Sequence, residues 1–363
     1  MKEKIRVLVS NLPLPYHGIG SWTEEFNYFL KKNKFFDYVL SPSKDQDEVF
    51  AFSAKRKWFR GSSFFRDSAL KNWVVKDYSD KLLNLSEKNT PLQILVLDDQ
   101  VLLEGICKLK DRLPKGTEVI FYYHGHALSL KSVYSSLVDK VFFLTEAGYK
   151  ESLRINNEFT PEVEIIGNGV SSDLFFPLTS QQKTLIRQEL GFASEDKIIC
   201  WMANSRPVKG IHLFGKMIPR LLDLDPKVKI ITIGHNSNPD WEHNRVSQLG
   251  RLKPKELSRY LQISDYYFFT SLWKEGFGLS LVEAIKCGNF IFTSANGGIK
   301  DVVRGYPFVK LIDTPNIIDS WISEFQNQLL SFPMENKEEE MSQFLKDFHS
   351  LESWEFRLKK GLE

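Results

Sequence analysis

Short apolar runs, each followed by a polar or glycine turn and then by a helical pattern, recur along this chain of 363 residues. The runs have the length and composition of buried strands, and the segments between them have the spacing of amphipathic helices. Strands that alternate with helices form parallel sheets covered by helices, so the pattern predicts an α/β fold. The runs cover residues 5–9, 92–97, 118–123, 140–144, 163–166, 197–203, 228–234, 246–250, 265–270 and 290–293.

A turn-rich segment near the middle of the chain divides this alternation into two halves. Residues 167–170, GNGV, are followed by Asp173 and Pro177, and turn residues before a proline are typical of a domain boundary. The chain is also long enough for two domains that each bury a core. The sequence therefore predicts two doubly wound, Rossmann-like domains, one over residues 1–170 and one over residues 171–349.

Charge and cysteine usage exclude several classes of protein. The net charge of +2 argues against a nucleic-acid-binding protein. The three cysteines have no metal-ligand spacing and indicate a reducing compartment. The first apolar run is too short for a signal peptide, and no run approaches the length of a membrane span. We therefore expect a cytoplasmic protein with no nucleic-acid partner.

The stretch with the most chemical content covers residues 274–288, KEGFGLSLVEAIKCG. Gly276 and Gly278 flank Phe277 in a predicted turn, and a helix is predicted to begin near Leu279. Backbone N–H groups in such a turn can point at a ligand together with the helix N-terminus, an arrangement suited to phosphate.

Two glutamates bracket this turn. Glu275 precedes the glycines, and Glu283 lies about one turn into an otherwise apolar helix, where a carboxylate needs a partner. Carboxylates accept paired hydrogen bonds of the kind that vicinal sugar hydroxyls donate, so the stretch points to a sugar nucleotide. The spacing alone carries no meaning, because Glu355 and Glu363 repeat it in the polar tail.

The stretch EGFGLSLVEAIKCG resembles the E-x7-E signature of retaining GT-B glycosyltransferases, chiefly those of glycosyltransferase family 4. The resemblance implies a GT-B fold, in which an N-terminal acceptor-side domain and a C-terminal donor domain face a cleft. It also implies that a final helix at about residues 350–363, around Trp354, crosses back onto the first domain. Glu275 would be catalytic, and the residues implied in donor binding are Gly276, Phe277, Gly278, Leu279 and Glu283.

The first strand leads into HGIGSWTEE, residues 17–25. Gly18 and Gly20 would let the backbone approach a ligand at the N-terminus of the following helix, although an ordinary turn would look the same. The stretch is similar to a loop that lies beside the donor diphosphate and the acceptor in many family 4 enzymes. The resemblance implies donor binding by Gly18 and Gly20 and places His17 on the acceptor side.

Two cations follow the strand at residues 197–203. Arg206 and Lys209 lie at a strand-to-helix turn and are suited to a diphosphate, Lys as a point charge and Arg as a fork. They resemble the R…KG motif of the family, but only two residues separate them, which is fewer than usual. The shorter spacing puts simultaneous contact by both side chains in question.

Histidines follow the strand at residues 118–123 in the sequence His124-Gly125-His126. Polar residues at the carboxyl ends of strands face the ligand crevice in open α/β sheets. By resemblance, His124 lies near the transferred sugar and the β-phosphate and is predicted to be catalytic. His126 is predicted to be its neighbour on the acceptor side.

A basic and aromatic segment, KRKWFRGSSFFR, begins at Lys55 and ends at Arg66. Aromatic and basic side chains together suit an anionic membrane surface, so the protein could bind peripherally to the inner face of a membrane. A solvated loop or helix edge explains the segment equally well.

The resemblance implies a retaining glycosyltransferase that moves a sugar from a GDP- or UDP-sugar to a glycan or lipid-linked acceptor, in bacterial surface polysaccharide synthesis. The nucleotide-sugar is a substrate, and no cofactor or metal is expected. The two DxD triplets, at residues 45–47 and 223–225, lie in a polar loop and at a predicted helix end. The alternatives are another GT-B sugar-nucleotide enzyme, such as an epimerase or phosphorylase, and a catalytically silent homologue that binds glycan.

Overall fold

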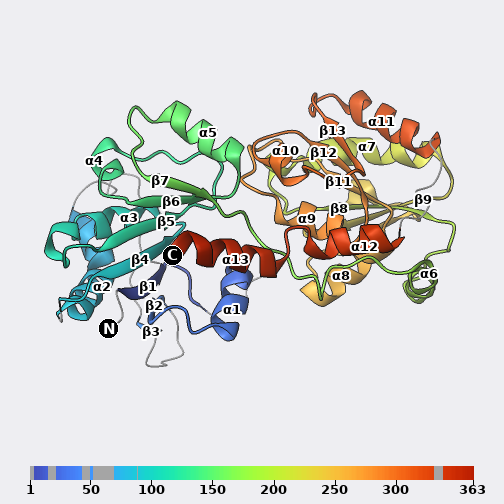
Figure 1. The fold of residues 1–363 in the computed structure, drawn as a ribbon. Coiled ribbons are helices and arrows are strands. Elements are labelled where there is room, and N and C mark those ends of the chain that lie inside the picture. Colours follow the sequence, from blue (N-terminus) through green and yellow to red (C-terminus); the bar gives the residue numbers. More distant parts are fainter. Residues whose placement is uncertain (1–3, 15–21, 43–49, 52–68, 88, 331–337) are drawn as a thin grey trace. The chain divides into compact units, whose positions relative to one another are not determined.

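The computed structural model of the chain describes residues 4–14, 22–42, 50–51, 69–87, 89–330 and 338–363. For residues 50–51, 69–74 and 338–340 it describes the backbone alone. The chain divides into two compact units, which Figure 1 shows as two ribbons with their own sheets. Unit 1 contains residues 1–167 and 357–363, and unit 2 contains residues 168–356. The sequence placed these boundaries at residue 170 and near residue 350.

Unit 1 is built on a parallel sheet whose described strands run in the order β3-β2-β1-β4-β5-β6-β7. The order reverses at β1, because β2 lies on one side of it and β4 on the other. The strands are β1 (Ile5–Ser10), β2 (Tyr38–Leu40), β3 (Phe50–Ala51), β4 (Leu92–Leu97), β5 (Glu118–Tyr122), β6 (Lys140–Phe143) and β7 (Glu162–Ile165). The helices are α1 (Thr23–Lys32), α2 (Ala69–Ser86), α3 (Gln100–Cys107), the 3-10 turn η3 (Lys110–Arg112), α4 (Ser132–Ser135), α5 (Glu146–Ile155) and the last turns of α13 (Leu351–Leu362).

The central strands of the unit 1 sheet are buried on both faces, which explains why they are mostly apolar. Val7 and Val9 share one core cluster with α2 and α3, while Leu8 between them is equally buried on the opposite face. On that opposite face, the end of α13 is tied to unit 1 by Gln93, whose amide donates to the Leu362 carbonyl at 2.8 Å. Lys359 also donates to the Asn33 side chain, just after α1, at 2.6 Å.

Unit 2 repeats the architecture with strands in the order β10-β9-β8-β11-β12-β13, all parallel within the described residues. The strands are β8 (Lys197–Met202), β9 (Val228–Ile233), β10 (Val246–Gln248), β11 (Tyr266–Phe269), β12 (Phe290–Ser294) and β13 (Val309–Ile312). The helices are α6 (Ser180–Glu189), η4 (Pro207–Lys209), α7 (Ile211–Leu224), η5 (Pro239–Trp241), α8 (Pro254–Ile263), α9 (Leu279–Lys286), α10 (Ile299–Val302), α11 (Ile318–Leu330), α12 (Glu338–Asp347) and the first part of α13.

Helices cover both faces of the unit 2 sheet (Figure 1). On one face, α7 and α11 enclose an aromatic core in which Trp201 stacks on Phe214 and Phe268 stacks on Phe292. On the other face, α8 and α9 pack against β8, β11 and β12. The predicted α/β class with two doubly wound domains is therefore confirmed.

Every strand that the sequence predicted is present, with ends that differ by at most a few residues. The sequence missed β2, β3 and β13, which have between two and four residues and so give little periodic signal. The helix predicted to begin near Leu279 is also present, as α9. In unit 1, Thr145 caps α5 by accepting from the Gly148 N–H at 3.2 Å.

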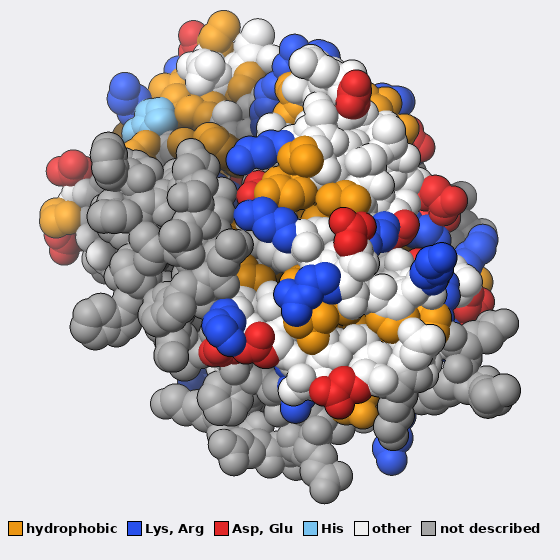
Figure 2. Space-filling model, turned by 90° about the vertical axis from the view of Figure 1, so that its left-hand side faces the viewer, with side chains coloured by type: hydrophobic (Ala, Val, Ile, Leu, Met, Phe, Trp, Pro, Cys, Tyr) orange, Lys and Arg blue, Asp and Glu red, His pale blue; other side chains and the backbone are white. Residues whose placement is uncertain are grey.

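Two surface properties bear on the partners of the protein. Among the described helices, none combines the length and the apolar character needed to cross a bilayer. On the face that Figure 2 shows, the basic and acidic side chains of the described residues are interspersed and do not gather by sign.

Candidate active site

The predicted glycine turn connects β11 to α9 in unit 2, and its backbone is held against a second glycine turn. Gly278 has φ +83° and caps the N-terminus of α9, a conformation that favours glycine. Gly297, with φ +70°, pairs with Glu275, and a Cβ there would lie 2.4 Å from the Glu275 carbonyl oxygen. Gly298 N–H donates to the same oxygen at 2.8 Å. The turn therefore needs glycine at both positions.

The carboxylate of Glu275 is nearly buried and is held by two side chains from neighbouring turns. Lys209 Nζ lies 2.5 Å from Glu275 Oε1, and the Ser271 hydroxyl donates to the same oxygen at 2.5 Å. Only 9% of Glu275 is exposed, so the ion pair is largely shielded from solvent. The sequence placed Lys209 and Glu275 in one site but did not predict that they bond each other.

Lys209 reaches this position because η4 turns sharply into α7. Gly210 has φ +76°, and a Cβ there would lie 2.2 Å from the Thr270 carbonyl oxygen at the end of β11. The close approach brings the end of η4 against the strand that delivers the glycine turn.

Arg206, the other predicted cation, is exposed and has a different partner. Its backbone N–H and its Nε donate to Asn204 Oδ1 at 3.1 and 3.3 Å. The two cations therefore have different environments: Lys209 bonds Glu275, whereas Arg206 lies at the surface.

Glu283 lies on α9 and differs from Glu275 in having no bonded partner. No hydrogen bond or ion pair reaches its carboxylate from any part of the chain that the structure describes. Burial raises the pKa of Glu283 from 4.5 to about 7. A partly buried carboxylate without a partner is suited to accept hydrogen bonds from a ligand.

The side chain of Phe277 points into the protein. It is 3% exposed and packs edge to face on His349 with ring centroids 5.0 Å apart. Any contact of Phe277 with a donor is therefore limited to its backbone. Leu279 is partly buried at the first position of α9.

His124 lies in unit 1, directly after β5, and is held by its backbone and by two rings. Its N–H donates to Asp98 Oδ1 at 2.9 Å. The imidazole stacks on Trp22 at 4.4 Å between centroids and lies 4.2 Å from the ring of Tyr122. Both ring nitrogens are buried, and burial lowers the pKa of His124 to about 3, although the nearby Tyr122 backbone acts in the opposite direction.

We expect the buried neutral imidazole of His124 to make the folded protein sensitive to acid. The folded-state pKa of about 3 lies below the ordinary 6.5. Between these two values the imidazole is protonated in the unfolded chain but stays neutral in the folded protein. The free energy of unfolding should fall by up to about 1.4 kcal/mol per pH unit as the pH drops from 6.5 towards 3. His124→Phe should reduce this slope in urea unfolding, whereas a matched change at exposed His212 should not. Equal slopes in the wild type and in His124→Phe would contradict the expectation.

The other predicted residues of unit 1 are His126, which is described, and a group that lies outside the described residues. His126 is partly buried, two residues after His124 in the same loop. His17, Gly18, Gly20 and the segment from Lys55 to Arg66 lie outside the described residues.

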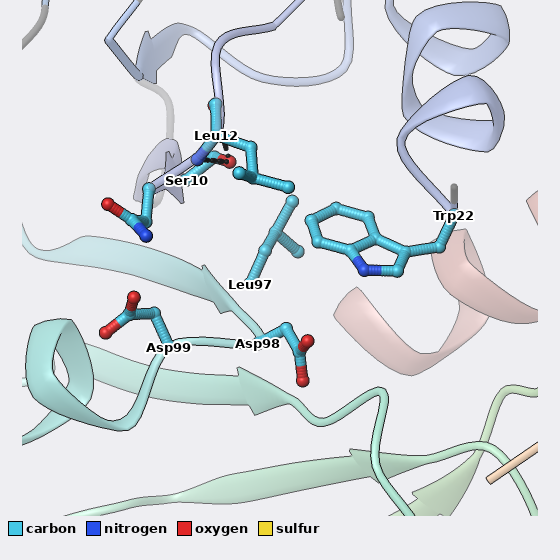
Figure 3. A pocket seen from close by; sticks show the side chains of 7 residues that line it. Ser10, Leu12, Trp22, Leu97, Asp98 and Asp99 are labelled. Atoms are coloured by element: carbon cyan, nitrogen blue, oxygen red, sulfur yellow. Dashed lines mark hydrogen bonds between the residues drawn. The ribbon is translucent and has the colours of Figure 1, made fainter. Parts of the chain in front are cut away.

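A cavity of about 150 Å³ opens in unit 1 where β1 and β4 end (Figure 3). It lies at the point where the strand order of the sheet reverses, which is where open α/β sheets bind ligands. The sequence drew attention to polar residues after strand ends but did not identify this cavity. Its lining residues are Ser10, Asn11, Leu12, Trp22, Leu97, Asp98 and Asp99.

The acidic triplets do not form a described metal site. Asp225 accepts from the Lys197 ammonium and from the Lys227 N–H, both at 2.8 Å, so it has a structural role at the end of α7. The triplet at residues 45–47 lies outside the described residues. Where the chain is described, no group of three or more His, Cys, Asp or Glu side chains could hold a metal ion.

Comparisons with known proteins show what this chain is similar to. Residues 182–320 match the family described as glycosyl transferases group 1. The chain is 26% identical over 152 residues to a D-inositol 3-phosphate glycosyltransferase of Corynebacterium aurimucosum, covering 38% of this chain and 36% of the relative. It is 21% identical over 262 residues to a lipopolysaccharide 1,2-N-acetylglucosaminetransferase of Salmonella typhimurium, covering 67% and 66%.

A solved structure extends the likeness over the whole fold. Anabaena HepE, in complex with UDP and glucose, superposes with a TM-score of 0.70 over 99% of both chains at 14% identity. The site residues from Arg206 to Glu283 all lie inside the segment that matches the family. Residues 182–320 therefore match a glycosyl transferases group 1 domain, in a chain that has the GT-B fold.

Proposed function

We propose that this protein is a retaining, metal-independent glycosyltransferase of family 4 that uses a GDP- or UDP-sugar. The observation that carries the proposal is the arrangement around the N-terminus of α9. There a glycine turn within the matched segment is flanked by a shielded Lys209–Glu275 pair and by Glu283, which bonds none of the described residues. This set combines a cation and backbone N–H groups for a diphosphate with two carboxylates for sugar hydroxyls.

The diphosphate would be neutralised by Lys209, Arg206 and the N-terminus of α9. These groups provide positive charge where the leaving phosphate develops negative charge, so the reaction would need no metal ion. His124 would act from unit 1 near the transferred sugar, as the resemblance to family 4 implies.

Retention would follow from attack and departure on one face of the sugar. A double displacement needs a carboxylate on the far face as nucleophile, whereas Glu275 lies among the glycines that would grip the sugar and diphosphate. The leaving phosphate would then help to take the proton of the acceptor. Glu275 would hold sugar hydroxyls and stabilise positive charge on the ring, and Glu283 would hold the ribose.

The acceptor would be a glycan or a lipid-linked saccharide in bacterial surface polysaccharide synthesis, made at the cytoplasmic side of the membrane. The lipopolysaccharide 1,2-N-acetylglucosaminetransferase named above supports such an acceptor, whereas the D-inositol 3-phosphate glycosyltransferase is named for a smaller one. Binding of Anabaena HepE to UDP and glucose supports a UDP-sugar as the first donor to test.

Two other functions would use the same fold. An epimerase or phosphorylase would bind a sugar nucleotide or sugar phosphate without transferring the sugar to a saccharide. A silent homologue would bind glycan but not donor, although the Lys209–Glu275 pair and the unpartnered Glu283 favour a working donor site.

A thermal-shift screen of UDP-, GDP- and ADP-sugars in the presence of EDTA tests the proposal. A donor at 100 times its Kd should raise the stability of the folded protein by about 2.7 kcal/mol, and added Mn²⁺ should not be needed. Lys209→Met should lose the shift, whereas Lys216→Met, a matched change at an exposed site on α7, should keep it. No shift with any donor, or a shift that requires Mn²⁺, would overturn the proposed donor site.

A further inference from the structure

We propose that the cavity at the ends of β1 and β4 is a subsite for one neutral sugar ring of the acceptor, with Trp22 as the stacking surface and Asp98 as the hydroxyl acceptor. The proposal rests on the proposed function and names a site for its second substrate. The described donor-binding candidates, from Arg206 to Glu283, lie in unit 2, whereas every residue that lines the cavity belongs to unit 1.

The size and lining of the cavity favour a single polar ring. Its volume of about 150 Å³ is below the roughly 300–1,000 Å³ of pockets for drug-sized ligands. The side chains of Asp98, Asp99 and Trp22 border it (Figure 3), and Asn11 also belongs to its lining. Two carboxylates disfavour an anionic ligand, while an aromatic face next to hydrogen-bonding groups suits a sugar, which is apolar on its ring face and polar at its edge.

The two carboxylates have different tasks. Asp99 Oδ1 accepts from the N–H groups of Val101 and Leu102 at 2.9 and 3.0 Å, so this residue caps α3. Asp98 Oδ1 accepts the His124 N–H at 2.9 Å, and its Oδ2 has no partner among the described residues. Asp98 therefore has an oxygen available to a ligand.

Asp98 is also held in an unfavourable backbone conformation. Its φ is +45°, in the left-handed region that residues other than glycine rarely adopt. Its N–H donates to the Tyr122 carbonyl at 2.9 Å, which together with the His124 contact fixes the residue across the ends of β4 and β5. Desolvation raises the pKa of Asp98 to about 6. This value is still below 7, so the carboxylate at the edge of the cavity is mostly ionised at neutral pH.

Trp22 is positioned by rings on its own unit. One contact is the stack on His124, with an interplanar angle of 20°, and another is an edge contact with Phe26 at 6.0 Å. These contacts fix the plane of the indole, which borders the cavity beside Asp98 (Figure 3). A sugar in the cavity would thus touch the ring that packs on the predicted catalytic His124.

Fluorine NMR of the full chain labelled with 5-fluorotryptophan tests the subsite without requiring turnover. The resonance of Trp22 is assigned by its loss in Trp22→Phe. Methyl α-D-glucopyranoside, methyl α-D-mannopyranoside, methyl 2-acetamido-2-deoxy-α-D-glucopyranoside and myo-inositol serve as probes. At least one should move the Trp22 resonance saturably, and Asp98→Asn should weaken that binding about tenfold, as expected for a hydrogen bond to a charged group.

We expect Asp98→Asn to fold, because asparagine tolerates a left-handed φ and its side-chain carbonyl can still accept the His124 N–H. The remaining tryptophan resonances report whether the variant is folded, and Asp111→Asn, at an exposed site of unit 1, should bind the probe like the wild type. A Trp22 resonance that no probe moves, unchanged affinity in Asp98→Asn, or an equal shift with MgCl₂ alone would overturn the subsite. If nucleotide-sugars fail to bind while the Trp22 resonance still moves, the proposed donor fails and the sugar subsite stands.

Discussion

Replacing Glu275 by glutamine should lower kcat about 10²- to 10³-fold and leave the donor Kd nearly unchanged. The expected size is that of losing one group that stabilises transition-state charge. Glutamine has nearly the shape of glutamate and can still accept from Lys209 and Ser271, so the loss of charge is the main change at this nearly buried position. Only interactions that strengthen in the transition state raise kcat, so the effect should appear in turnover and not in binding.

Isothermal calorimetry for the donor and initial rates at saturating donor separate the two effects of Glu275→Gln. Glu242→Gln, at an exposed position of unit 2, is the matched control and should behave like the wild type. A donor Kd that rises as much as kcat falls would assign Glu275 to ground-state binding. An unchanged kcat would show that Glu275 has no role in the chemical step.

Replacing Glu283 by alanine should weaken donor binding about 10- to 100-fold with little change in kcat at saturating donor. The estimate corresponds to losing hydrogen bonds from ribose hydroxyls to a charged acceptor, at about 1.5–3 kcal/mol. Since no described group bonds this carboxylate, its removal breaks no hydrogen bond or ion pair among the described residues. Donor calorimetry on folded Glu283→Ala measures the effect, and an unchanged Kd would refute the ribose role.

The alternative is that Glu283 is a structural carboxylate that unit 2 needs in order to fold. The stability of Glu283→Gln distinguishes this alternative from a role in ligand binding. The folded-state pKa of Glu283, about 7, lies above its ordinary 4.5, so ionisation costs folding stability. This cost grows as the pH rises from 4.5 to about 7 and is constant above it. Glu283→Gln should therefore be more stable than the wild type at pH 8 and similar near pH 4. Lower stability of Glu283→Gln at pH 8 would favour the structural role.

The glycine turn shows how much the sequence alone could predict. An apolar run, two glycines and an amphipathic stretch were enough to place β11, the turn and α9, because each depends on local backbone preferences. Which way Phe277 points was not predictable, since burial on His349 depends on a residue 72 positions away, 349 minus 277, whose packing leaves no local signal. The resemblance identified the turn, but it could not predict that the Phe277 side chain is buried and that Phe277 offers a ligand only its backbone.

Contacts between distant residues were beyond the sequence for the same reason. The Lys209–Glu275 pair joins residues 66 positions apart, and it forms because Gly210 lets η4 approach the end of β11. Asp98 directly follows the strand that the sequence predicted at residues 92–97. Its positive φ, its bond to His124 and the cavity beside it arise only when β1, β4 and β5 are side by side.

The most direct test of the central claim follows the purified protein and the best-binding nucleotide-sugar by ¹H NMR. Slow transfer to water, in EDTA and without a saccharide acceptor, should release nucleoside diphosphate and a free sugar whose first detected anomer keeps the configuration of the donor. Glu275→Gln should reduce this release about 10²- to 10³-fold. Release of the inverted anomer, or release in the wild type no faster than in Glu275→Gln, would contradict a retaining glycosyltransferase centred on Glu275.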